Sequence, residues 1–130
     1  MTSPAGSPFT ILLVDDSLPL LEALQYLLYD ESDLVVVGIA ETGKRAIELA
    51  TALSPDMVLL DVQLPDMAGY EVAQSVKALP QPPIVILISA NGDQLSRERG
   101  LAAGGDGFIE KGSDWPQIIQ QIRLILSKNI

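Results

Sequence analysis

Short apolar runs of strand length alternate along this chain with segments whose apolar residues recur at helical spacing. The runs, rich in Val, Ile and Leu, are Phe9–Val14, Leu34–Ile39, Met57–Leu60, Ile84–Ile88 and Asp106–Glu110. The segments with helical spacing begin at Ser17, whose hydroxyl can cap a helix, and continue as Gly43–Leu53, Gly69–Leu79, Gln94–Ala103 and a last helix from a Ser113 cap to about Ser127. Most of the strand runs are apolar on both faces, which is typical of a parallel sheet covered on both sides.

This alternation predicts an α/β fold with a doubly wound parallel sheet. Parallel strands need crossover connections, and right-handed crossovers place helices on both faces of the sheet. At 130 residues the chain is long enough for one core and too short for two domains. We expect one domain over residues 9–130, preceded by a flexible segment of small residues, MTSPAGSP, over residues 1–8.

The composition excludes several classes of chemistry. The chain has no Cys and no His, so zinc sites with thiolate or imidazole ligands, Cys nucleophiles, Ser-His-Asp triads and disulfides are ruled out. Any metal must be a hard cation with oxygen ligands. The net charge of −9 argues against direct binding to nucleic acid or to an anionic membrane. With no apolar run of membrane-spanning length and no signal-peptide pattern, we expect a cytoplasmic protein.

Polar side chains follow the ends of four predicted strands. Asp15 and Asp16 follow the first strand, Asp61 the third, Ser89 the fourth and Lys111 the fifth. Ligands of such folds bind at the carboxyl ends of the strands, so these side chains are the candidate site. Three clustered carboxylates repel one another unless a cation lies among them, and with oxygen ligands alone Mg²⁺ is favoured.

A carboxylate beside Mg²⁺ can act as a nucleophile toward phosphorus. Asp61 is the best candidate, because it stands alone at the end of the middle strand. The Lys111 ammonium and the Ser89 hydroxyl can contact phosphoryl oxygens. Gly38–Lys44 also matches the GxxxxGK pattern of nucleotide-binding loops, but Arg45 follows where Ser or Thr would bind Mg²⁺, so we reject that reading.

In order along the chain, the motifs VDDS, LLDVQLPDMAGYE, LISAN and GFIEK resemble those of the receiver domain of bacterial two-component response regulators. The resemblance covers about Thr10 to Leu126. It implies a flavodoxin-like (βα)5 fold with strand order 2-1-3-4-5. The segments GIAETGKRAIELA and GLAAGGDGFIEK resemble receivers that are attached to helix-turn-helix output domains.

The resemblance also implies a role for each site residue. Asp61 would accept a phosphoryl group from a histidine kinase or phosphotransfer protein acting in trans. Mg²⁺ would bind Asp16, Asp61 and the backbone carbonyl of Gln63, with Asp15 supporting it through water or a hydrogen bond. Lys111 would pair with the phosphoryl group. Ser89 would move toward that group, and Phe108 would stand at the aromatic switch position.

The chain departs from the family pattern at two of these places. Gly112 follows Lys111 where many members have proline, so we expect a more mobile loop there. Phe108 replaces the usual tyrosine and lacks the hydroxyl that could report ring position through a hydrogen bond. Gln63 and Asn91 lie where a side chain can order or block the hydrolytic water. Trp115 and Leu124 fall at the edge of the last helix's apolar stripe and could mark a partner surface.

We therefore expect a phosphorylation-dependent switch that catalyses only its own phosphorylation and dephosphorylation. Its output would be contact with a downstream protein through the last two strands and helices, a surface that could also join two copies in a homodimer. Two alternatives remain open: an interaction module that kept the fold without responding to phosphate, and the receiver fragment of a longer transcriptional regulator.

Overall fold

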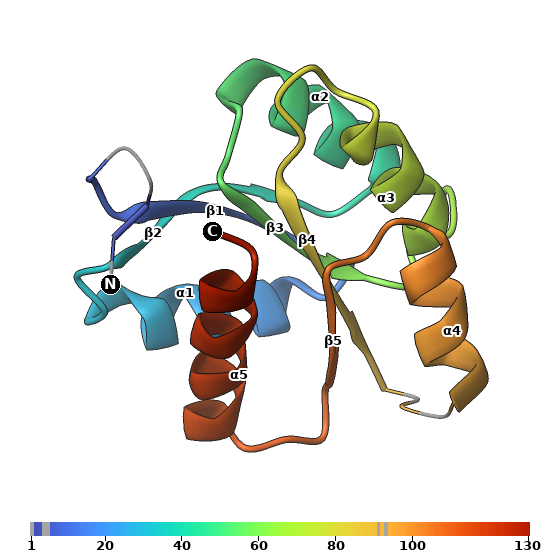
Figure 1. Ribbon diagram of the computed structural model, residues 1–130. Helices are drawn as coiled ribbons and strands as arrows, with labels where there is room; N and C mark the ends of the chain where they lie inside the picture. The colour runs from blue at the N-terminus through green and yellow to red at the C-terminus, as the bar shows by residue number, and fades with distance from the viewer. Residues whose placement is uncertain (1, 4–5, 91, 93) are drawn as a thin grey trace.

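The computed structural model describes residues 2–3, 6–90, 92 and 94–130. Five strands and five helices alternate strictly along these residues (Figure 1). They are β1 (Phe9–Val14), α1 (Leu18–Tyr29), β2 (Leu34–Ala40), α2 (Gly43–Leu53), β3 (Met57–Asp61), α3 (Gly69–Lys77), β4 (Ile84–Ser89), α4 (Gln94–Ala102), β5 (Gly107–Glu110) and α5 (Trp115–Lys128). Each predicted element is present, with ends that differ by at most two residues.

The strands form one parallel sheet in the order β2-β1-β3-β4-β5. This is the order that the resemblance implies. β3 lies in the middle, with Leu59 beside Leu13 of β1 and Leu60 beside Leu87 of β4. The chain changes direction across the sheet between β1 and β3, and the carboxyl ends of these two strands meet at that point.

Two apolar cores lie on opposite faces of the sheet. Alternate residues of each strand point to opposite faces, so Leu13 packs in one core and Leu12 in the other. The first core is closed by α1 and α5, and the second by α2, α3 and α4, as Figure 1 shows. The strand runs are apolar on both faces because both faces are covered.

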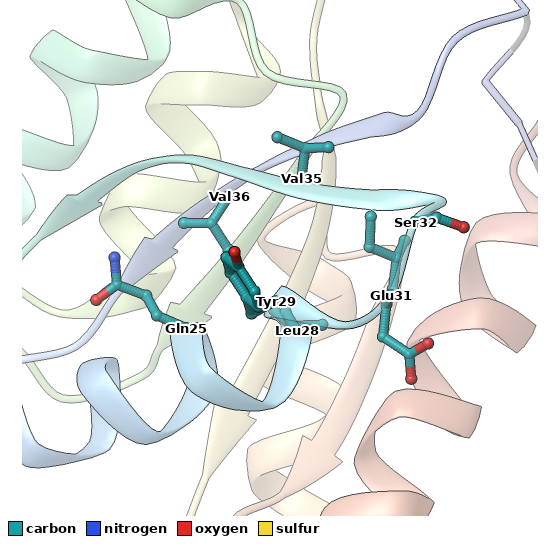
Figure 2. A pocket seen from close by; sticks show the side chains of 8 residues that line it. Gln25, Leu28, Tyr29, Glu31, Ser32, Val35 and Val36 are labelled. Carbon is teal, nitrogen blue, oxygen red and sulfur yellow. The ribbon is translucent and has the colours of Figure 1, made fainter.

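The edge strands β2 and β5 are less buried than the central strands, and β2 exposes apolar side chains. Val35 is 43% exposed and Val37 is 37% exposed. A hollow of about 390 Å³ lies between β2 and the end of α1, lined in part by Leu28, Tyr29 and Val36 (Figure 2). It lies at the start of β2, so it is at the end of the sheet opposite to the strand ends that carry Asp15 and Asp61.

The caps of two helices show where the local sequence predicts the start of a helix correctly and where it does not. Ser17 caps α1 as predicted, since its Oγ accepts a hydrogen bond from the Leu20 amide at 3.3 Å. The predicted Ser113 cap of α5 is wrong. Asp114 is the cap and accepts from the Gln117 amide at 3.0 Å, while the Ser113 amide closes a turn to the Glu110 carbonyl. In the described part of the chain, no helix combines the length and apolar character needed to cross a membrane.

Candidate functional site

The site is the rim where the carboxyl ends of β1, β3, β4 and β5 meet. Asp61 ends β3 beside Ile88, and Ser89 ends β4 beside Glu110, so each polar residue follows an apolar run that anchors it. Asp15, Asp61 and Ser89 are buried, at 2%, 4% and 4% exposure. Buried carboxylates need partners, so the contacts of these acids decide what the rim can do.

Asp15, Asp16 and Asp61 form a compact acidic cluster. One carboxylate oxygen from each lies within 4.8 Å of the other two. Asp15 and Asp61 are buried, while Asp16 is exposed. Asp15 and Asp16 follow β1 and Asp61 ends the neighbouring strand β3, so the two strand ends bring the acids together.

Lys111 supplies the positive charge of the cluster. Its Nζ lies 3.0 Å from Asp15 Oδ2 and 3.0 Å from Asp61 Oδ2. Burial disfavours the charged ammonium, but hydrogen bonds to Asp15 and Asp61 outweigh this effect and raise the pKa of Lys111. One ammonium therefore faces three carboxylates, and the cluster keeps a net negative charge.

Hydrogen bonds fix one oxygen of each buried acid. The Ser17 amide donates to Asp15 Oδ1 at 2.9 Å, and the Gln63 amide donates to Asp61 Oδ1 at 3.2 Å. Asp15 Oδ2 is buried and, apart from its ion pair with Lys111, receives no well-aligned hydrogen bond from the described residues. A cluster of three carboxylates that offers only oxygen ligands fits a hard divalent cation such as Mg²⁺.

A close approach of α3 to β3 shapes the loop that follows Asp61. The Gly69 amide donates to the Val62 carbonyl at 2.8 Å, and Gln63 forms an isolated bridge with Ala68. A Cβ atom at position 69 would overlap the Asp61 carbonyl oxygen. Only glycine lets the helix begin this close to the end of the strand.

Asp66, in the same loop, is a residue that sequence reasoning missed. Its carboxylate accepts hydrogen bonds from the Gly43 and Lys44 amides at 2.8 and 2.9 Å, and these bonds lower the pKa of Asp66. Those amides begin α2, where a nucleotide-binding loop would hold phosphate. An internal carboxylate occupies them instead, which agrees with rejecting the GxxxxGK segment as a nucleotide site.

Ser89 and Phe108 lie on neighbouring strands beside this rim. The Ser89 carbonyl accepts from the Lys111 amide at 2.9 Å. Phe108 pairs with Leu87 and packs, half-buried, against the core under α4. The guanidinium of Arg97, which sequence reasoning also missed, lies 5.1 Å from the centre of the Phe108 ring. Asn91 lies outside the described residues.

The two apolar side chains expected at the edge of the last helix are exposed. Trp115 is 40% exposed and Leu124 is 56% exposed. They lie at the start and in the second half of α5. Gly112 is in open space and does not have a positive φ angle, so the backbone there does not require glycine.

Comparison with known proteins shows which family this chain is similar to. The family profile described as "Response regulator receiver domain" matches residues 11–123. Transcriptional regulatory protein YdfI of Bacillus subtilis is 32% identical over 120 residues, which are 92% of this chain and 56% of YdfI. The chain spans about half the length of the curated relatives it matches.

Solved structures agree with this match. The receiver domain of the putative response regulator NarL from Mycobacterium tuberculosis superposes with a TM-score of 0.84 at 32% identity, covering 89% of this chain and 94% of that one. A chain of the CheX-CheY-BeF3-Mg²⁺ complex from Borrelia burgdorferi gives 0.85 at 26% identity, covering 94% and 92%.

Proposed function

The chain belongs to the response regulator receiver domain family of two-component systems, and from this premise we propose that it is a switch phosphorylated on Asp61. The observation that carries the proposal is the pairing of Lys111 Nζ, at 3.0 Å, with both buried acids of a three-carboxylate cluster. An ion pair that only stabilises the fold seldom leaves a net negative charge in a buried site. The excess negative charge here is explained if the site binds a cation and accepts a phosphoryl group.

In the proposed step, an Asp61 carboxylate oxygen attacks the phosphorus of a phosphohistidine in a histidine kinase or phosphotransfer protein. The phosphorus–nitrogen bond of the donor breaks as the oxygen–phosphorus bond forms, and the imidazole nitrogen keeps the electron pair and takes up a proton. The phosphohistidine lies outside these 130 residues, because they contain no histidine. The Gln63 amide donates to Asp61 Oδ1, and the Lys111 ammonium donates to Asp61 Oδ2. Oδ2 is therefore the oxygen nearest to positive charge.

Mg²⁺, when bound, would neutralise charge on the phosphoryl oxygens and on the acids. We propose that Asp16, Asp61 and the Gln63 carbonyl hold it, and that Asp15 supports it from beside the site. Lys111 would exchange part of its contact with Asp61 for a phosphoryl oxygen. A chain of similar fold from Borrelia burgdorferi was solved in a complex with BeF3 and Mg²⁺, which supports Mg²⁺ as the ion.

The phosphoryl group on Asp61 would carry a charge of about −2 in place of the −1 of the carboxylate, and its oxygens would draw the Ser89 hydroxyl toward it. Ser89 ends β4, so its movement would change the loop before α4 and the position of Phe108 on β5. We propose that this altered surface of β4, β5, α4 and α5 contacts a downstream protein and can also join two copies. The chain would then act as a signalling module and not as an enzyme on a separate substrate.

A second candidate concerns the output. Relatives of about twice this length are named transcriptional regulators, which favours the receiver part of a longer regulator. In that case, the same surface would act on an attached DNA-binding domain. Both candidates share phosphorylation of Asp61. They differ in whether a separate protein or an attached domain responds to it.

Intact mass after incubation with Mg²⁺ and acetyl phosphate tests the shared step. The native chain should gain one phosphoryl group, Asp61→Asn should gain none, and Asp56→Asn, which alters an acid at the other end of β3, should behave as native. A native chain that gains nothing from acetyl phosphate or from phosphohistidine donors would instead indicate an interaction module that does not respond to phosphate.

A further inference from the structure

α4 is attached to the rest of the molecule by few contacts. Its one buried residue is Gly100, whereas every other helix buries three or four residues, counted over the described part of the chain. Gly100 lies against Leu87 and Phe108, and the Tyr70 hydroxyl donates to the Ser96 carbonyl at 3.5 Å. Because so little apolar surface fixes α4, single side-chain contacts have a large influence on its position.

Arg97 makes two of these contacts with one side chain. Its Nε donates to the Gly92 carbonyl at 3.2 Å, and its guanidinium carbon lies 5.1 Å from the centre of the Phe108 ring. This distance is within the range of a cation–π interaction. Gly92 belongs to the loop that follows Ser89, and Phe108 belongs to β5. Arg97 therefore bridges the Ser89 loop and the aromatic residue.

Gly92 is tightly packed at the point where Arg97 contacts it. A Cβ atom at Gly92 would overlap the Glu110 side chain, so Gly92 lies directly against the end of β5. Glu110 in turn pairs with Ser89 in the sheet. A shift of Ser89 and Gly92 toward Asp61 must change this packing and the hydrogen bond from Arg97.

We propose that Arg97 is a positioning residue that couples the Ser89 loop to Phe108, an inference that rests on the proposed phosphorylation of Asp61. Phe108 has no hydroxyl with which to sense the loop, and the Arg97 guanidinium supplies the link through the ring face. When Gly92 moves toward Asp61, its hydrogen bond from Arg97 breaks and the cation–π contact between Arg97 and the Phe108 ring weakens. Arg97 therefore opposes the rearrangement, and its removal makes the rearrangement easier.

The two phenylalanines of the chain make a direct measurement practical. Phe108 reports on the bridge, and Phe9, which is 1% exposed in the opposite core, is the internal reference. With ring-¹³C phenylalanine, Arg97→Met should shift the Phe108 NMR signals and leave those of Phe9 in place. Arg97→Lys, which keeps a cation for the ring, should move the signals back toward their native positions. Arg99→Met, a matched change on the same helix, should affect neither ring.

Beryllofluoride with Mg²⁺, as a phosphoryl analogue, tests the coupling. Arg97→Met should lower the half-saturating concentration about threefold, the size expected from losing an exposed cation–π contact. The effect should be absent when the same change is made in a Phe108→Leu background. An unshifted Phe108 signal, or an equal change in affinity in the Phe108→Leu background, would overturn the inference while the proposed function stands. A native chain that does not bind beryllofluoride would overturn both.

Discussion

At the scale of single residues, the site is a balance between three carboxylates and one ammonium. Lys111 lies 3.0 Å from both buried acids, and the bonds from the Ser17 and Gln63 amides hold the opposite oxygens in place. The burial of Asp15 and Asp61 makes each nearby charge count more than it would in water. A change of one charge here should therefore alter the binding of a cation.

Lys111→Met should bind Mg²⁺ more tightly than the native chain. Removing an ammonium a few ångströms from a divalent cation removes repulsion on the order of 1–2 kcal/mol, which is about tenfold in affinity. Calorimetric titration measures the Mg²⁺ affinity, with Lys128→Met at the far end of α5 as the control. Equal or weaker binding by Lys111→Met would show that the ammonium does not compete with a cation at this cluster.

Replacement by alanine should have opposite effects on stability at two glycines near the site. Gly69→Ala places a Cβ against the Asp61 carbonyl, so the start of α3 must shift, and we expect a loss of about 2–4 kcal/mol in the free energy of unfolding. Gly112→Ala meets open space at an ordinary φ angle and should gain about 0.4–1 kcal/mol. Urea unfolding compares them. A tolerated Gly69→Ala would contradict the close approach of α3 to β3.

At the scale of elements, α5 is tied to the loop between α1 and β2 by charge. Arg123 donates to both carboxylate oxygens of Asp33, with Nη2 at 2.8 Å and Nε at 3.1 Å, and its Nη2 donates to Glu31 at 3.1 Å. The hydrogen bond from Arg123 lowers the pKa of Asp33 below its ordinary value of 3.8. This paired arrangement closes the face of the sheet covered by α1 and α5.

Arg123→Met should reduce the free energy of unfolding by about 1 kcal/mol near neutral pH, a value that allows for the partial exposure of the pair. Because the pKa of Asp33 is lowered in the folded state, this stability is fully present above the ordinary value and is lost as the pH falls through the folded value. The difference between native and variant should therefore shrink below about pH 4. Arg45→Met, whose pair with Glu48 is exposed, should cost little. A difference that persists into acid would contradict the role of Asp33.

The elements themselves followed from the sequence because each carries its own signal. Buried strands appear in the sequence as apolar runs. Ser17 marks the start of α1, and the leucines after it mark the face of this helix that packs in the core. The α5 cap was misplaced by one residue because Ser113 and Asp114 are both good caps, and only the turn to Glu110 decides between them. Local patterns thus give the type of an element better than its first residue.

At the scale of the whole molecule, the candidate site could be predicted because parallel topology gathers strand ends at one rim. Asp15, Asp61 and Lys111 are far apart in sequence, and the strand order brings them into contact. The contacts of Asp66 and Arg97 could not be predicted. Their partners, the α2 amides and the Phe108 ring, are fixed by how loops and helices pack over the sheet, and neither residue carries a sequence signal for such a partner.

The central claim is that Asp61, and not its neighbours in the acidic cluster, accepts the phosphoryl group. Borohydride reduces an aspartyl phosphate to homoserine, so peptide mass spectrometry after treatment with Mg²⁺, acetyl phosphate and borohydride locates the acceptor directly. We expect homoserine at position 61 alone, and none when Mg²⁺ is removed by a chelator. Homoserine at position 15 or 16, with Asp61 unchanged, would contradict it.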